Sequence, residues 1–186
     1  MAMNSELVRR LLLYIADQLQ DMEAPISTTR LVKFLYLIDL EHYNHYYKTL
    51  TGIDWVKYDH GPYFFAWPEV LRSTRLDLEP EEVETERGRG ITFHSLEPHD
   101  ISDAVSFATQ ARIGRILSRW AYEDLNVLLH HVYETLPVRH GIYCQELDFM
   151  LETDHLLLEE ATDTATHFLT LDELMTDYEA HSGGDT

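Results

Sequence analysis

The residues of this sequence best suited to acid–base chemistry are a carboxylate and two histidines, Asp39, His42 and His60. Asp39 and His42 are three positions apart, so on a helix their side chains are neighbours and could exchange a proton. His60 stands before Gly61-Pro62, a pair typical of a turn that starts a helix. One interpretation is a small enzyme that uses these three groups. The commoner alternative is a buried carboxylate whose hydrogen bonds are satisfied locally.

Motifs of other catalytic sites are missing from the sequence. It contains no Gly-rich dinucleotide loop, no P-loop, no G-x-S-x-G elbow and no H-E-x-x-H zinc motif. His42 and His45 form an H-x-x-H pair, but on a helix they point about 60° apart, and no third ligand is evident. We therefore predict a protein that is not an enzyme and has no catalytic residues, cofactor or metal.

Two helices at the start of the chain must position these groups. Apolar residues recur every three or four positions from Leu7 to Met22, which predicts an amphipathic helix over 5–22 with Ser5 as its N-cap. A second helix, over 27–48, is apolar nearly all round. We expect it to be the central and most buried helix of the fold.

Polar residues of the second helix fall on two arcs. One arc is a polar stripe made of Arg30, Lys33, Glu41, Asn44 and Lys48. Asp39 lies with His42 on the opposite, apolar arc. Because unpaired polar groups are costly to bury, we predict that Asp39 is buried and hydrogen-bonded. Its expected donors are the His60-Gly61-Pro62 turn, a tyrosine hydroxyl or His42.

The segment 55–68, WVKYDHGPYFFAWP, is rich in aromatic residues and has three interpretations. Aromatic side chains on a restricted backbone suit protein recognition, and the candidate partner-binding residues are Trp55, Tyr58, Tyr63 and Trp67. In the alternative, Trp55, Tyr58, Phe64 and Phe65 mostly complete the core. Nucleobase stacking is the least favoured interpretation, because it requires a basic groove beside the aromatic rings.

The remaining pattern predicts further helices and one hairpin. A short helix is expected over 68–72, and EVETE can pair with ITFHS across the turn RGRG. Helices over 101–120 and 124–134 follow, and a capping box opens a helix over 170–178 before a disordered end, HSGGDT. We therefore predict a mainly α fold, a compact helical domain with a small antiparallel β-hairpin, at the margin of the α+β class.

One basic ridge stands out on this acidic chain. Arg112, Arg115 and Arg119 lie on one side of the helix predicted over 101–120. Most such ridges are solvated faces paired to local acids. The alternative is a contact with an anion or an acidic peptide. A DNA-binding repressor of its own operon would need this ridge as its recognition surface.

Charge and composition restrict the class of partner. The sequence carries 33 acids and 14 bases, a net charge of −19. Residues 138–186 hold one base and twelve acids. Such a field repels phosphate backbones, which disfavours nucleic acid, and attracts a partner with a basic surface. The single cysteine, Cys144, and the lack of a signal peptide or long apolar run predict a cytoplasmic protein without a membrane segment.

The stretch 31–62, LVKFLYLIDLEHYNHYYKTLTGIDWVKYDHGP, resembles the Panacea domain family, the SocA-like antitoxins also met as phage-associated proteins. The residues that fit the family pattern are Lys33, Leu35, Tyr36, Leu37, Asp39, Glu41, His42, Leu50, Thr51, Gly52, Trp55, Tyr58, Gly61 and Pro62. Phe34 replaces a usual leucine, and Tyr46-Tyr47-Lys48 stands where the family has a glycine.

The resemblance implies a helical antitoxin domain over 1–140 that neutralises a co-encoded protein toxin by direct contact. Delivery of the toxin to a cellular protease is a further route. The family motif assigns structural roles to Lys33, Tyr36, Asp39, His42, Gly52, His60, Gly61 and Pro62. Residues 141–186 have no counterpart in the family and are expected to form an acidic, partly helical extension that ends in a disordered tail.

Overall fold

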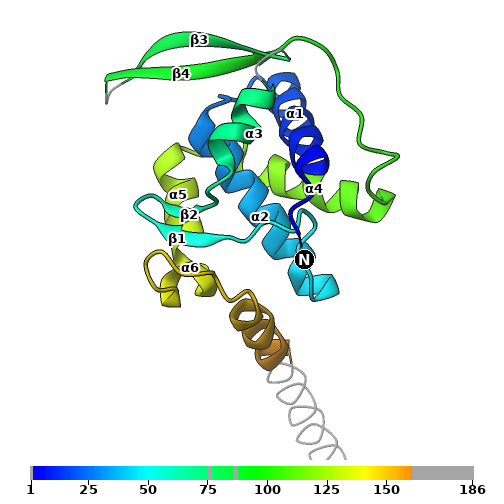
Figure 1. Ribbon diagram of the computed structural model, residues 1–186, viewed down its shortest axis with the longest axis vertical. Coiled ribbons are helices and arrows are strands. Elements are labelled where there is room, and N and C mark those ends of the chain that lie inside the picture. The colour runs from blue at the N-terminus through cyan, green and yellow to red at the C-terminus, as the bar shows by residue number, and fades with distance from the viewer. Residues whose placement is uncertain (1, 75–76, 86–87, 161–186) are drawn as a thin grey trace, which may run out of the picture.

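The computed structural model, which describes residues 2–74, 77–85 and 88–160, is built around α2 (Thr28–Tyr46) (Figure 1). All residues from Arg30 to Leu40 are buried, because this part of the helix is apolar nearly all round. The helix ends where Tyr47 adopts the left-handed conformation, with φ 54°. The prediction of a central helix is confirmed, although the helix stops at Tyr46 and not near residue 48.

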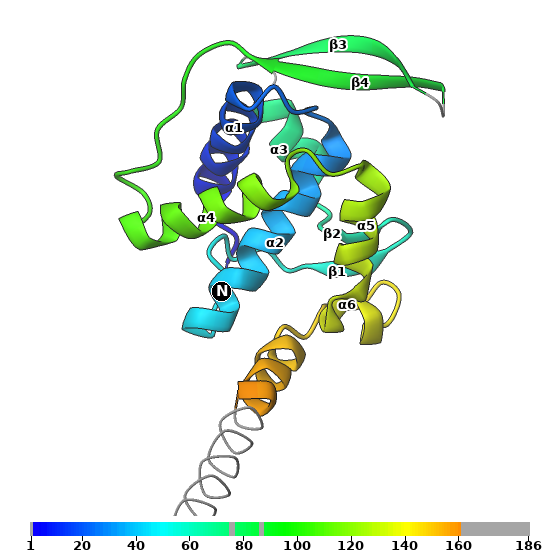
Figure 2. The ribbon, with the colours of Figure 1, turned by 180° about the vertical axis from the view of Figure 1, so that it is seen from behind.

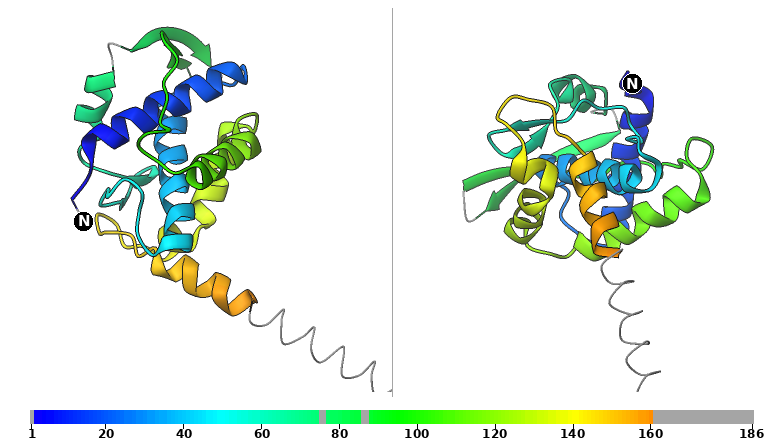
Figure 3. Two further views of the ribbon diagram at one scale, coloured as in Figure 1. Left: turned by 90° about the vertical axis from the view of Figure 1, so that its right-hand side faces the viewer. Right: turned by 90° about the horizontal axis from the view of Figure 1, so that it is seen from below.

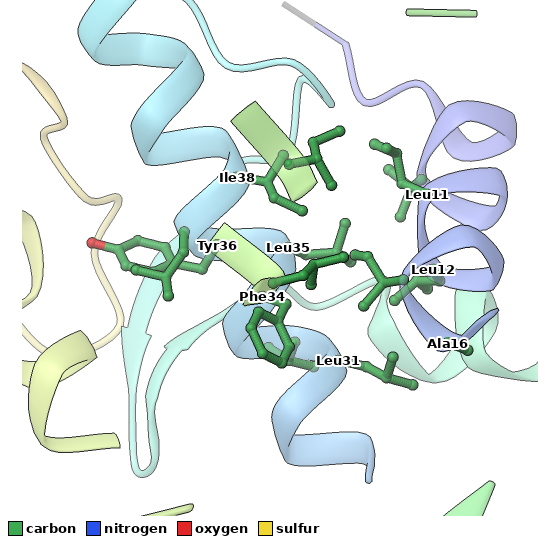
Figure 4. Packing of buried hydrophobic residues seen from close by; sticks show 14 of the residues in the cluster. Leu11, Leu12, Ala16, Leu31, Phe34, Leu35, Tyr36 and Ile38 are labelled. Carbon is green, nitrogen blue, oxygen red and sulfur yellow. The ribbon is translucent and has the colours of Figure 1, made fainter. Parts of the chain in front are cut away.

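The apolar face of α1 (Ser5–Asp21) packs on α2 and closes one side of the core. Figure 4 shows Leu11 and Leu12 on this face, turned toward α2. The N-cap is Asn4, whose side chain accepts a hydrogen bond from a backbone N–H of the first turn. The predicted cap, Ser5, was therefore wrong by one position.

Three further helices complete the helical body. Figure 2 shows α4 (Phe107–Trp120) lying across α2, with α5 (Leu125–Glu134) and the short α6 (Leu136–His140) after it. The helix predicted from residue 101 begins later, because Ser106 caps it. Before this cap, Ile101 and Val105 join the core without being helical.

A β-hairpin lies where one was predicted, but its register differs from the predicted one. Residues 91–95 pair with 78–82, and Gly88 and Gly90, which were expected in the turn, lie inside the second strand. Strand β3 (Leu78–Thr85) pairs antiparallel with β4 (Gly88–Ser95), above α1 in Figure 1. The backbone N–H of Phe93 donates to the carbonyl of Ile26 at 2.9 Å, which ties β4 to the chain between α1 and α2. Helix α3 (Trp67–Thr74) precedes the hairpin, close to the position predicted for it.

A second antiparallel pair, β1 (Val56–Tyr58) with β2 (Gly61–Tyr63), was not predicted. Pro62 lies inside β2, so the prediction that Gly61-Pro62 opens a helix is wrong. The helix that follows starts at Trp67 instead. This hairpin places His60 in its turn, away from any helix N-terminus.

The chain after α6 first packs on the body and then leaves it. Leu147 and Phe149 belong to the core, and the backbone N–H of Leu147 donates to the carbonyl of Trp55 at 2.8 Å. A helical segment over 150–160 then points away from the body (Figure 3). The predicted helix over 170–178 and the predicted tail lie outside the described residues.

The architecture is mainly α with two small antiparallel strand pairs, as the sequence predicted for the class. None of the described helices has both the length and the apolar composition needed to cross a bilayer.

Candidate protein-interaction surface

Asp39 of α2 is fully buried, as predicted, but its hydrogen-bond donors differ from the predicted ones. It accepts from the backbone N–H of Thr51 at 3.0 Å, from the indole N–H of Trp55 at 2.8 Å, and from the Thr51 hydroxyl. The His60 turn, a tyrosine and His42 are not its partners. Burial raises the pKa of Asp39 to about 6, although these hydrogen bonds oppose the shift.

Lys33 of α2 is also buried, and it binds the β1–β2 turn. Its ammonium donates to the backbone carbonyl of His60 at 2.6 Å and to that of Pro62 at 3.1 Å. Burial lowers the pKa of Lys33 to about 8. Arg30 is buried too, and it donates to backbone carbonyls at the end of α4, among them that of Ala121 at 3.2 Å. The prediction of a polar stripe is therefore wrong for Lys33 and for Arg30.

Two glycines let the chain approach closely at the places where α2 holds it. Gly52 has φ 70°, and a Cβ there would lie 2.7 Å from the carbonyl oxygen of Ala2. Gly61 has φ 88°, and a Cβ there would lie 2.7 Å from Cε1 of Tyr133. Both positions therefore require glycine for backbone conformation and for space. The structural roles expected for these two family-motif residues have a physical reason here.

These contacts form a clamp, which we define as Lys33, Asp39, Thr51 and Trp55. Asp39 fixes the chain before β1, and Lys33 fixes the turn after it. Tyr36, a further motif residue, donates or accepts a hydrogen bond at 2.8 Å with the Thr135 hydroxyl, on the side of α2 turned away from α1 (Figure 4). The motif residues of α2 thus determine where the β1–β2 hairpin lies.

The β1–β2 hairpin and the segments beside it carry a cluster of four aromatic rings, here called the aromatic surface: Tyr58, Tyr63, Phe65 and Tyr143. The Tyr58 ring stacks on Tyr63 with centroids 5.6 Å apart, and on Tyr143 at 5.4 Å. Phe65 meets the edges of Tyr58 and Tyr63 at 6.1 and 6.2 Å. Phe65 is 66% exposed, Tyr143 54% and Tyr58 37%, so the rings are available to a partner.

Two of the four predicted partner-binding residues are not on this surface. Trp55 is 1% exposed and Trp67 is 5% exposed, and both belong to the core. Phe64 is buried with them, in edge contact with both indoles. The alternative interpretation, that Trp55, Tyr58, Phe64 and Phe65 mostly complete the core, is therefore right for Trp55 and Phe64 and wrong for the exposed Tyr58 and Phe65. Tyr58 and Tyr63 remain as surface candidates.

Tyr143 joins the aromatic surface from a distant part of the sequence. The segment around it runs beside β1: Cys144 N–H donates to the Lys57 carbonyl at 2.8 Å, and Lys57 N–H to the Gln145 carbonyl at 3.1 Å. The Tyr143 hydroxyl donates to Asp59 at 2.9 Å, and this hydrogen bond raises the pKa of the tyrosine. Sequence reasoning missed Tyr143, because only its position 85 residues after Tyr58 was visible.

A cavity of about 560 Å³ lies next to the segment that carries Tyr143. Its lining includes three exposed carboxylates, Asp54, Glu146 and Asp148, and the rings of Tyr43 and Tyr47. Lys48 is the one basic residue in the lining. This groove is therefore suited to a cationic side chain.

The three groups considered for acid–base chemistry are held by separate partners. His42 donates through Nδ1–H to the Lys48 carbonyl at 2.7 Å, and burial lowers the pKa of His42. His60 is exposed in the β1–β2 turn, and Asp39 is enclosed by the clamp. Within the described ranges, no group of three or more His, Cys, Asp or Glu side chains is arranged to hold a metal ion.

The arginine ridge lines a second cavity, of about 400 Å³, between α2, α4 and the 150–160 helix. The ridge was expected most often to pair with local acids. The ion pairs of the described residues involve other side chains, and none includes Arg112, Arg115 or Arg119. Arg115 and Arg119 are exposed, as expected for a solvated face, but the expected pairing with local acids is not seen among the described residues.

Comparison with known proteins assigns the chain to a family. A search of curated proteins and a search of solved structures found no significant match. The family model described as "Antitoxin SocA-like, Panacea domain" matches residues 31–137, which include α2, the clamp, the β1–β2 hairpin and the arginine ridge. Because this match covers more than half of the 186 residues, the chain belongs to the SocA-like antitoxin family with a Panacea domain.

Proposed function

We propose that this antitoxin-family protein neutralises a co-encoded protein toxin by direct contact, and that the aromatic surface is the centre of the contact. The observation that carries the proposal is the cluster of four neighbouring rings at the surface, of which Phe65, Tyr143 and Tyr58 are exposed. Monomeric proteins rarely leave such clusters uncovered without a binding role.

Aromatic rings are efficient anchors because they bury a large area and lose few rotamers when they bind. The clamp supports this role, since it fixes the hairpin that carries Tyr58 and Tyr63 through buried hydrogen bonds from α2. A partner would therefore meet a preorganised surface, which lowers the entropy lost on binding.

The expected toxin surface is basic around an apolar centre. Asp54, Glu146 and Asp148 line the groove beside the Tyr143 segment, and the whole chain carries a net charge of −19. Complementary charge accelerates association more than it strengthens the final complex. We expect the association rate to fall as salt is added, and the protein and toxin to meet in the cytoplasm.

Co-expression with the neighbouring toxin gene tests the proposal, with growth as the readout. Phe65→Ala and Tyr143→Ala should lose neutralisation, because anchors at an interface centre commonly contribute about 2 kcal/mol or more. Matched controls are Phe107→Ala on α4 and Tyr122→Ala after it, which remove exposed rings (86% and 72%) outside the aromatic surface. Both controls should still rescue growth.

Two outcomes would contradict the proposal. Rescue by both Phe65→Ala and Tyr143→Ala would show that these rings do not anchor the toxin. Equal loss of rescue in Phe107→Ala and Tyr122→Ala would show that the effect is not specific to this surface. Toxin half-life in the same strains separates occlusion, which leaves the half-life unchanged, from delivery to a protease, which shortens it.

A further inference from the structure

The arginine cavity, defined by Arg112, Arg115 and Arg119 and the walls around them, is a second site with a chemistry opposite to that of the rest of the chain. The three arginines come from one face of α4. Leu37, Leu40, Glu41 and Asn44 of α2 form the facing wall, and Glu152 and Leu156 of the 150–160 helix form another. Figure 2 shows α4 crossing α2 above the point where this last helix leaves the body.

The guanidinium groups in this cavity have hydrogen-bond donors to spare. Arg112 donates to the Tyr46 hydroxyl at 3.0 Å and lies over that ring, but its buried Nε has no hydrogen-bond partner. Arg115 is exposed, and in the part of the chain that the structure describes it takes part in no ion pair. An arginine has five N–H donors, so an anion in the cavity would find several of them available.

The two carboxylates of the cavity lining, Glu41 and Glu152, form no ion pair with these arginines, and each has another partner. Glu152 accepts from the backbone N–H of Leu136 at 2.7 Å. Glu41 lies 3.8 Å from Nδ1 of His45. The lining therefore holds three arginines against two carboxylates, and the cavity keeps a net positive charge.

The remaining lining is apolar or already covered. Leu37, Leu40, Ile116 and Leu156 supply aliphatic surface. Trp120 is covered by the His131 ring, stacked at 4.2 Å, and by the Arg119 guanidinium, 5.0 Å from the indole centroid. A nucleobase would find no free indole face for stacking, which disfavours a nucleotide as the ligand.

We propose that the arginine cavity binds an acidic peptide segment of a protein partner, with carboxylates on the arginines and an apolar side chain on the aliphatic wall. Arg115 and Arg119 are separated by about 6 Å along the helix, at 1.5 Å per residue. Carboxylates at alternate positions of an extended peptide lie about 7 Å apart, which is close to this spacing. The charge-assisted hydrogen bonds of carboxylate to guanidinium give such a contact its specificity.

This site is separate from the aromatic surface and takes a partner of opposite charge. The toxin proposed above is basic, whereas the segment bound here is acidic. The two sites share no residue, so a complex with the toxin would leave the arginines for a further protein. The inference therefore does not depend on the proposed neutralisation surface.

Fluorescence anisotropy with the full-length protein tests the inference. The probe is a short fluorescein-labelled peptide in which glutamate and leucine alternate, and its control has glutamine at every glutamate position. We expect the glutamate peptide alone to bind, and Arg115→Gln or Arg119→Gln to weaken it by about tenfold each. Leu156→Glu should weaken binding as well, because it adds a carboxylate to the cavity.

The matched control is Arg72→Gln, which makes the same charge change at an exposed arginine of α3 and should leave binding unchanged. Circular dichroism on each variant verifies that the fold is retained. Equal affinity for the two peptides, or equal weakening by Arg72→Gln and Arg115→Gln, would overturn the inference. Saturable binding of inorganic phosphate without binding of the peptide would also overturn it and assign the cavity to small anions.

Discussion

Replacing Asp39 with asparagine should destabilise the protein, because the carboxylate is the shared acceptor of the clamp. Its two oxygens receive the Thr51 N–H, the Thr51 hydroxyl and the Trp55 indole N–H. The amide has one acceptor oxygen, so its NH₂ group must face a buried N–H of Thr51 or Trp55. An unsatisfied buried donor costs about 1–3 kcal/mol, and we expect a loss of about 2 kcal/mol at neutral pH.

Thermal unfolding followed by circular dichroism measures this loss. For a chain of this size, about 2 kcal/mol corresponds to a decrease in Tm of about 4–8 °C. The control is Asp54→Asn, which removes the same charge from an exposed side chain and should change stability by less than about 0.5 kcal/mol.

The pH dependence gives a second readout of the same residue. Burial raises the pKa of Asp39 from 3.8 to about 6, so the folded state binds a proton more tightly than the unfolded state. The resulting stabilisation is complete below the unfolded pKa and is lost as the pH rises through about 6. When the pH is lowered from 7.5 to 5.5, the free energy of unfolding of the wild type should therefore rise by about 0.8 kcal/mol relative to that of Asp39→Asn. The measurement stops at pH 5.5 to stay above the sequence pI of about 4.7.

Equal melting temperatures of Asp39→Asn and Asp54→Asn would show that Asp39 is not the acceptor that holds Thr51 and Trp55. A stability difference that narrows on acidification would contradict the direction of the pKa shift.

Three other changes test the clamp and the proposed function. Lys33→Met should lose the hydrogen bonds to the β1–β2 turn. Because burial lowers the pKa of Lys33 to about 8, the free energy of unfolding of the wild type should rise by about 1 kcal/mol relative to that of the variant between pH 7.5 and 9. Urea unfolding at the two pH values measures this difference. Gly61→Ala should destabilise the fold by about 2 kcal/mol, since it adds left-handed strain and a close contact with Tyr133. The control Gly114→Ala in α4 should be neutral or stabilising, because a Cβ there meets nothing within 4 Å. Equal Tm values for the two variants would contradict the predicted strain at Gly61. His60→Ala should still neutralise the toxin in the growth assay, because the turn uses the backbone carbonyl of His60, and loss of rescue confined to histidine variants would favour the enzyme alternative.

Local patterns predicted most of the helical body. The apolar periodicity of α1 and the continuous apolar run of α2 predicted two helices, and predicted that the second is the more buried. The turn signals between EVETE and ITFHS predicted that a hairpin exists but not its register, because Gly88 and Gly90 pair with Thr85 and Val83 inside the strands. These signals are reliable because they arise from neighbours within a few residues, where helical and strand periods determine which side chains share a face.

The sequence also singled out Asp39 as a buried charge, since it interrupts an apolar arc. It did not reveal the donors, because Thr51 and Trp55 lie 12 and 16 residues further along a segment without regular periodicity. The prediction that Gly61-Pro62 starts a helix was wrong for a related reason. Pro62 tolerates both a helix N-terminus and an edge strand, and pairing with Lys57 decided between them.

The sequence by itself determined the family, the helical class, the acidic charge and the buried position of Asp39. Tertiary packing alone decided that Lys33 is buried, that Trp55 and Trp67 are core residues, and that Tyr143 completes the aromatic surface. The same holds for the arginines of α4, which line a cavity and take part in no ion pair with the described residues. The physical reason is that local periodicity assigns a side chain to a face, whereas long-range packing determines whether that face meets solvent, a backbone carbonyl or another ring.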